Sequence, residues 1–146
     1  MAGALIVGVG GDGSGFQAAR TAARVANLMQ APLVLVFGYE AVAMGPRGGA
    51  LEEEIEAVGD AAVAEIRDEL LAAYPNLTVE VEMVQERPVE ALINVAAARG
   101  AEAIAVGHGG SGPLKAALLG SITYEIVHRA PIPVLVVPND EADTDG

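Results

Sequence analysis

The chain has 146 residues, of which 52% are hydrophobic and 19% are charged, and a chain of this length folds by default as one compact domain. Eight Lys and Arg residues against twenty Asp and Glu residues give a formal net charge of −12. Such an acidic surface repels nucleic-acid backbones and anionic lipid, so the composition argues against both as partners. The sequence lacks cysteine and any apolar stretch long enough to span a bilayer. We therefore expect a cytoplasmic protein without disulfides, thiolate chemistry or membrane insertion.

The first half of the chain predicts two buried strands, each followed by a helix. Residues 4–9 form a short apolar run that ends in glycines, which is typical of a strand buried on both faces. A helix with Ser14 as its N-cap is expected to follow as far as Met29, because small apolar residues recur there at helical spacing. A second buried strand is expected at 32–37. The clearest amphipathic helix is expected at 51–74, with one apolar stripe made of Leu51, Ile55, Val58, Ala62, Ile66 and Leu70.

The second half of the chain predicts three further strands and two helices. Residues 77–83 alternate strictly between apolar and polar side chains, which indicates a strand at the edge of a sheet. Pro88 is the expected start of the next helix and Gly100 its end. The remaining expected elements are a strand at 103–107, a helix at 121–130, a strand at 134–137 and an acidic tail at 139–146.

Strands and helices therefore alternate along the whole chain. Strict alternation predicts an α/β fold, with a mainly parallel sheet, right-handed crossovers and helices on both faces. No internal repeat or second domain is visible in the sequence. We expect one domain over residues 1–138, followed by the acidic tail at 139–146.

Glycines gather between the fourth expected strand and the last expected helix, at positions 107, 109, 110, 112 and 120. Glycines let a backbone approach phosphate oxygens closely, and a helix N-terminus offers unpaired N–H groups at the positive end of its dipole. Ser121, the expected N-cap of that helix, and Thr123 add two hydroxyl groups. The pattern fits an anion-binding loop, and it fits equally a flexible loop with a serine cap.

The spacing of Gly107-x-x-Gly110, nine residues and then Gly120-Ser121 resembles the nucleotide-binding motif of the universal stress protein family. The resemblance extends over residues 4–138, through the opening strand, the start of the third helix, and the closing helix and strand. It implies a doubly wound, five-stranded parallel sheet in the order 3-2-1-4-5. It also implies binding of ATP or a related adenine nucleotide, with Mg²⁺ arriving with the nucleotide, and a homodimer formed through Val134–Val137.

In that strand order the first and fourth strands flank the point where the order reverses, which is where open α/β sheets bind ligands. The resemblance assigns the base and ribose to the backbone at Val9, Gly10 and Val36. It assigns the phosphates to the glycine-rich loop and to the start of the last helix. Further contacts are expected from Asp12 and His108. The implied site residues are Val9, Gly10, Asp12, Val36, Gly107, His108, Gly110, Gly120, Ser121, Ile122 and Thr123.

One departure from the family pattern concerns the aspartate that usually follows the first strand directly, where this chain has Gly10. Asp12 is the candidate replacement. The alternatives are a nucleotide that binds more weakly or is of another kind, or a nucleotide-free interaction module. Another alternative is Gly8-x-Gly10-x-x-Gly13, which matches a dinucleotide-binding fingerprint. Lys115, the sole lysine, is a candidate phosphate contact or a solvated loop residue. The sequence names no catalytic group, so we expect a stress-response or signalling protein with at most slow ATP hydrolysis.

Overall fold

The protein is described by a computed structural model that covers residues 3–11, 13–40, 48–109 and 120–138. These residues form one five-stranded sheet in the order β3-β2-β1-β4-β5, in which all four strand pairs are parallel. The predicted α/β class and the implied strand order are confirmed. The elements are β1 (Leu5–Gly8), α1 (Phe16–Met29), β2 (Leu33–Gly38), α2 (Gly48–Ala73), β3 (Val79–Val84), α3 (Pro88–Arg99), β4 (Ala103–Gly107), α4 (Ser121–Arg129) and β5 (Val134–Val137).

The strand order reverses at β1, the central strand of the sheet. Leu5 of β1 lies opposite Leu33 of β2 on one side and opposite Ala103 of β4 on the other. The chain therefore moves outward from β1 to β3, crosses back through α3, and continues outward in the other direction from β4 to β5. Because all five strands are parallel, their carboxyl ends meet at one edge of the sheet.

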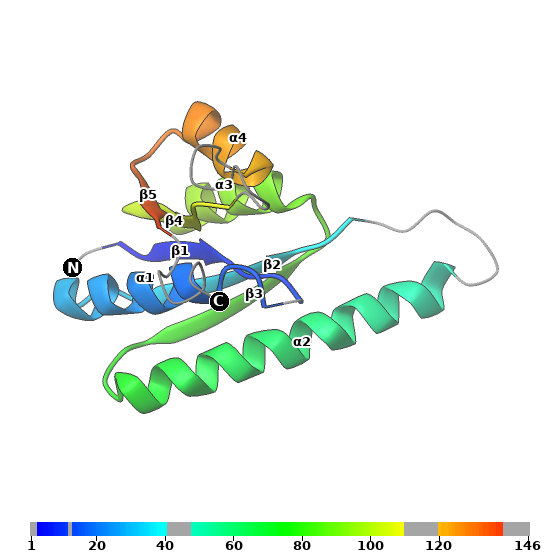
Figure 1. Cartoon of the computed structure of the whole chain (residues 1–146), viewed down its shortest axis with the longest axis horizontal. Helices are drawn as coiled ribbons and strands as arrows, with labels where there is room; N and C mark the ends of the chain where they lie inside the picture. Colours follow the sequence, from blue (N-terminus) through cyan, green and yellow to red (C-terminus); the bar gives the residue numbers. More distant parts are fainter. Residues whose placement is uncertain (1–2, 12, 41–47, 110–119, 139–146) are drawn as a thin grey trace, which may run out of the picture.

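Helices cover both faces of the sheet and bury two separate apolar clusters (Figure 1). The first cluster joins Val7 of β1 to α1 and α2, and the second joins Ile6 of β1 to α3 and α4. Neighbouring residues of β1 enter different clusters because successive side chains of a strand point to opposite faces. Both clusters are largely aliphatic, as the composition requires.

At the helix ends, two sequence predictions are wrong and two are confirmed. Ser14 is not the N-cap of α1; Gly15 is, with φ +84°, a conformation that side-chain-bearing residues rarely adopt. Ser121 is likewise not the N-cap of α4, because the helix begins at Ser121 and the preceding glycine caps it. In α3, Pro88 opens the helix and Gly100 closes it in the left-handed conformation, as predicted.

The amphipathic helix α2 is longer than the sheet that it covers. Its 26 residues extend about 39 Å, whereas a six-residue strand extends about 20 Å. Ile66 and Leu70 are buried against the sheet, but Leu51 and Val58, on the predicted apolar stripe, stay 43% and 54% exposed. The first turns of α2 therefore reach past the sheet (Figure 1). Among the described residues, no helix is both long and apolar enough to cross a bilayer.

Candidate functional site

A cavity of about 480 Å³ opens at the carboxyl edge of the sheet, where the strand order reverses. The ends of four strands and the first turns of α1, α3 and α4 enclose it. Its described lining contains no charged side chain. The lining residues are Gly8, Val9, Gly10, Ser14, Gly15, Gln17, Ala18, Val36, Gly38, Pro88, Leu92, Val106, Gly107, Gly109, Gly120, Ser121, Ile122, Thr123, Val137 and Pro138.

The turn between β1 and α1 forms one wall of the cavity. The N–H of Val9 donates to the carbonyl oxygen of Val36 at 2.9 Å, and the N–H of Gly10 donates to the carbonyl oxygen of Ser14 at 2.8 Å. A Cβ at Gly15 would lie 2.1 Å from the carbonyl oxygen of Gly8, so α1 packs directly on the end of β1. This close approach brings Gln17, in the first turn of α1, to the cavity.

The two ends of the glycine-rich loop meet at the opposite wall. The N–H of Gly120 donates to the carbonyl oxygen of His108 at 3.0 Å, and the N–H of His108 donates to Val137 of β5 at 2.8 Å. Gly109 has φ +71°, and a Cβ there would lie 2.7 Å from the Cα of Gly120. Only glycine at position 109 permits this contact, which fixes the start of α4 beside the end of β4.

The N-terminus of α4 presents backbone donors to the cavity. The N–H of Tyr124 is the first to bond within the helix, to the carbonyl oxygen of Gly120 at 2.9 Å. The N–H groups of the three preceding residues, Ser121 to Thr123, therefore have no acceptor within the helix. No side chain caps α4, and neither α1 nor α4 carries an acidic residue in its first turn. Two helix dipoles thus favour negative charge at the cavity.

The two hydroxyls of this turn have different roles. Thr123 is 4% exposed, and its hydroxyl donates to the carbonyl oxygen of Gly107. Its proton therefore ties α4 to the end of β4, and only oxygen lone pairs remain for a ligand. Ser121 is exposed at the cavity rim, where its hydroxyl can donate.

Gly107 leaves space where any other residue would place a side chain. A Cβ at Gly107 would meet no described atom within 4 Å, and Gly107 lines the cavity. Gly38 differs, because a Cβ there would lie 2.9 Å from the Cβ of Ala91. Gly38 thus lets α3 approach the end of β2, whereas Gly107 keeps the cavity open.

Most of the site residues expected from the sequence meet at this cavity. His108 is not among its lining residues; its Nδ1 lies 3.2 Å from the carbonyl oxygen of Gly109. Asp12, Gly110 and Lys115 lie outside the described residues. The expected residues that line the cavity are Val9, Gly10, Val36, Gly107, Gly120, Ser121, Ile122 and Thr123.

Sequence reasoning missed other lining residues for two reasons. Gly15 is the N-cap of α1 and Gln17 lies in its first turn. Both follow the glycine-rich end of β1 closely in the sequence, and that position is a signal for residues beside the cavity. Pro88 and Leu92 reach the cavity because α3 crosses the sheet between β3 and β4. No local sequence pattern predicts where along the sheet α3 crosses it.

The fold and the cavity define an open parallel α/β protein with a ligand-binding crevice at the reversal of strand order. The sequence model of the Universal stress protein family matches residues 1–138. The chain therefore belongs to the universal stress protein family.

Relatives and solved structures agree with this assignment. A universal stress protein of Mycolicibacterium smegmatis is 31% identical over 144 residues, covering 94% of this chain and 48% of that protein. The chain thus spans about half the length of that relative. A universal stress protein of Mycobacterium tuberculosis is 28% identical over 138 residues, covering 91% of this chain and 94% of that protein. A crystal structure of a universal stress protein in complex with cAMP has a TM-score of 0.74 at 26% identity, covering 92% and 96% of the two chains.

Proposed function

We propose that the chain binds an adenine nucleotide in the cavity between the ends of β1 and β4. One observation carries the proposal: a cavity of about 480 Å³ faces the N-terminus of α4, which has no side-chain cap. That volume is within the range of small-molecule sites, and the N-terminus supplies donors for a phosphate. The similar protein solved with cAMP supports an adenine nucleotide as the ligand class.

The residues present fit such a ligand. The apolar side chains of Val36 and Leu92 offer a surface for the base, and Gly107 leaves room for the ribose and first phosphate. The N–H groups of Ser121, Ile122 and Thr123, with the Ser121 hydroxyl, would bind phosphate oxygens. The motif spacing makes ATP the expected nucleotide. We propose a role in cytoplasmic stress response or signalling that depends on binding rather than on rapid hydrolysis.

A magnesium ion would arrive with the phosphates rather than bind a preformed metal site. In the described part of the chain, no group of three or more His, Asp or Glu side chains lies together in a way that would hold a metal. Mg²⁺ takes few protein ligands in nucleotide sites and shares the substrate phosphates. Asp12 stays a candidate ligand for this ion.

The mononucleotide is favoured over a dinucleotide by the turn after β1. In the dinucleotide fingerprint the third glycine permits close packing of the helix on the strand. Here a Cβ at Gly13 would meet no described atom within 4 Å, whereas a Cβ at Gly15 would clash with Gly8. The glycine that permits close packing is thus two residues beyond the fingerprint position.

Isothermal titration with ATP, AMP, cyclic AMP and NAD tests the ligand class. We expect saturable heat with at least one adenine mononucleotide and weaker binding of NAD. Native mass spectrometry of the purified protein gives a second readout, because a bound nucleotide adds its own mass. If none of the adenine mononucleotides binds, the proposal is wrong and the chain acts as a nucleotide-free interaction module.

We also propose that the chain forms a homodimer through β5, which lies at an edge of the sheet. The carbonyl oxygen of Pro133 accepts a hydrogen bond from Ile104 of β4 at 3.0 Å, and that of Val137 accepts one from His108, the residue after β4, at 2.8 Å. Backbone groups of successive strand residues point to opposite sides, so the N–H and C=O groups of Val134 and Val136 point away from the sheet. An apolar strand edge whose backbone groups point away from its own sheet favours pairing with a second strand.

A proline at position 136 tests this interface. Val136→Pro removes an outward N–H without removing a hydrogen bond to β4, so we expect the dimer to dissociate at micromolar concentration. Val136→Ala is the matched control, since it shortens the side chain but keeps the N–H. Sedimentation velocity measures both. A monomeric parent, or a proline variant that dimerises as well as the alanine variant, would contradict the proposed interface.

A further inference from the structure

Helix α4 depends on tertiary contacts for its position. It has nine residues, of which only Thr123 and Ile126 are buried. An isolated helix of this length is not stable in water, so its placement is set by the groups that it touches. At its N-terminal end, the Thr123 hydroxyl and the N–H of Gly120 bond to the end of β4 and the residue after it. In its remaining turns, the fully buried Ile126 packs into the apolar cluster shared with α3, and the exposed side of α4 has a polar attachment to α3.

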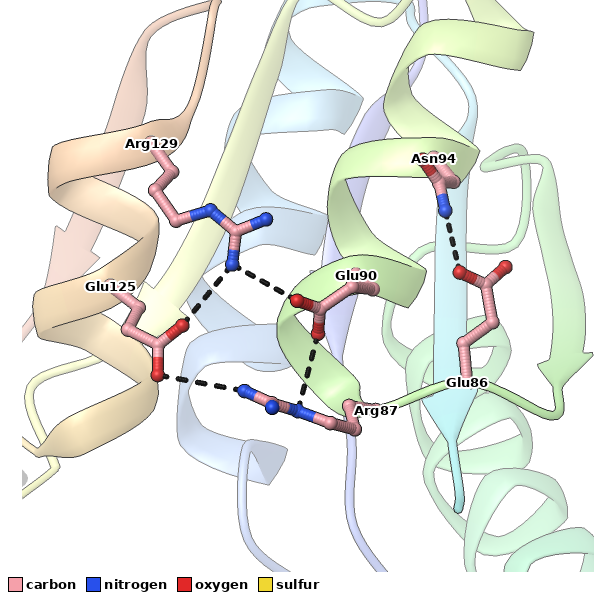
Figure 2. Close-up of polar contacts among 6 residues, drawn as sticks. All are labelled: Glu86, Arg87, Glu90, Asn94, Glu125 and Arg129. Atoms are coloured by element: carbon pink, nitrogen blue, oxygen red, sulfur yellow. Dashed lines mark hydrogen bonds and ion pairs between the residues drawn. The ribbon is translucent and has the colours of Figure 1, made fainter. Parts of the chain in front are cut away.

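That attachment is a group of four charged side chains shared by α4 and the start of α3 (Figure 2). Nη1 of Arg129 lies 3.0 Å from Oε1 of Glu90 and 3.2 Å from Oε2 of Glu125. Arg87 completes the group, with Nε 3.4 Å from Oε2 of Glu90 and Nη2 3.8 Å from Oε1 of Glu125. We call these four residues the α3–α4 ion-pair cluster. Each arginine contacts both carboxylates, so the charges form a closed ring.

The cluster lies beside two walls of the cavity. Pro88 and Leu92 of α3 line the cavity, and Arg87 directly precedes Pro88. On α4, Glu125 follows the turn from Ser121 to Thr123 that presents the backbone donors. The ring therefore joins two neighbouring helices whose residues both line the cavity. A shift of α4 relative to α3 would move the donors of α4 relative to the cavity wall formed by α3.

We propose that Arg87, Glu90, Glu125 and Arg129 are positioning residues that hold the first turn of α4 over the cavity and thereby set its affinity for a nucleotide. This inference rests on the nucleotide-binding function proposed above. None of the four residues lines the cavity, so they act through α4 and α3 rather than on the ligand. Partly exposed ion pairs contribute little to the stability of the whole fold. We therefore expect the loss of these pairs to change the placement of α4, a weakly attached helix, rather than the global free energy of unfolding.

The charge states agree with this role. Hydrogen bonding from the Arg129 guanidinium holds the pKa of Glu90 below its usual value, and Glu90 in turn raises the pKa of Arg129. Both groups therefore stay charged at neutral pH.

The test separates positioning from a long-range effect of charge on an anionic ligand. Glu125→Ala removes a negative charge, so a long-range effect would strengthen nucleotide binding. Positioning predicts the opposite, a loss of affinity of about threefold to tenfold by titration calorimetry, with little change in Tm. Glu80→Ala is the matched control, because Glu80 pairs with Arg99 at 2.9 Å at the opposite edge of the sheet. We expect its affinity to equal that of the parent.

Arg129→Lys supplies a rescue. One nitrogen of Arg129 makes both of its contacts, so a lysine ammonium can replace it, whereas Arg129→Ala cannot. We expect Arg129→Lys to keep the parental affinity and Arg129→Ala to lose it about as much as Glu125→Ala. Equal losses for lysine and alanine, or tighter binding by Glu125→Ala, would overturn the inference.

Hydrogen exchange of the nucleotide-free protein gives a readout that does not depend on binding. We expect the amides of residues 121–129 to exchange faster in Glu125→Ala than in Glu80→Ala. If the parent binds no adenine nucleotide but this difference is seen, the proposed function fails while the positioning of α4 stands. If the two variants exchange equally, the positioning role is wrong whatever the parent binds.

Discussion

We expect Gly107→Val to weaken the binding of adenine nucleotides by about 10-fold to 100-fold, because the new side chain would occupy the space that the ligand needs. Forcing extra methyl groups into a filled site costs about 1–3 kcal/mol, and each 1.4 kcal/mol is about a tenfold change in affinity. In the free protein the same side chain enters open cavity, because a Cβ at Gly107 meets no described atom within 4 Å. Valine also suits a strand, so the free energy of unfolding should not fall.

Titration calorimetry and thermal melting together decide the Gly107 prediction. Gly107→Ala adds a single methyl group and should give an intermediate loss of affinity. The combination of lost binding with an unchanged Tm is specific to a residue that lines the ligand site. If Gly107→Val bound nucleotide like the parent, the cavity would not be the nucleotide site.

The largest expected loss of stability follows from Gly15→Ala. The backbone at Gly15 has φ +84°, and a Cβ would lie 2.1 Å from the carbonyl oxygen of Gly8. A left-handed backbone with a side chain costs about 1–2 kcal/mol, and relief of the clash by moving α1 off β1 costs about 1–3 kcal/mol more. The free energy of unfolding, measured with urea, should therefore fall by about 2–5 kcal/mol, much of the total for a small domain.

Gly13→Ala is a matched control within the same turn. Gly13 has φ +87°, but a Cβ there meets no described atom within 4 Å. Gly13→Ala has the cost of the left-handed backbone without the clash. The difference in the free energy of unfolding between Gly13→Ala and Gly15→Ala therefore measures how closely α1 packs on β1. Equal losses of stability would show that only the backbone conformation requires glycine at position 15.

The fold was predictable because the sequence pattern and the packing agree. The alternation of residues 77–83 predicted an edge strand, and β3 is at the edge of the sheet. There Glu80 is exposed and Glu82 half-buried, and both pair with Arg99 of α3. Pro88 and Gly100 marked the ends of α3 because each residue has one backbone property that suits that position. Family resemblance supplied the strand order, which local patterns do not contain.

The site was less predictable, because its geometry depends on contacts between distant segments. Serines 14 and 121 were expected as N-caps from residue preference, but the caps are Gly15 and Gly120, where the backbone comes close to other segments. Leu51 was expected on the buried stripe of α2 and is exposed, because nothing in the helix pattern states how far the sheet extends. Long-range packing decided each of these positions.

The pairing of β1 with β4 has a consequence for the order in which the protein is made. Leu5 lies opposite Ala103, so the two central walls of the cavity come from segments 98 residues apart in the sequence. A nascent chain that has passed through β1, β2 and β3 can fold those elements locally, but it has no crevice. The crevice is complete only after β5 has left the ribosome, because Val137 and Pro138 also line it. The proposed nucleotide would therefore bind only to chains whose two halves have already joined, and it would not assist the early steps of folding during synthesis.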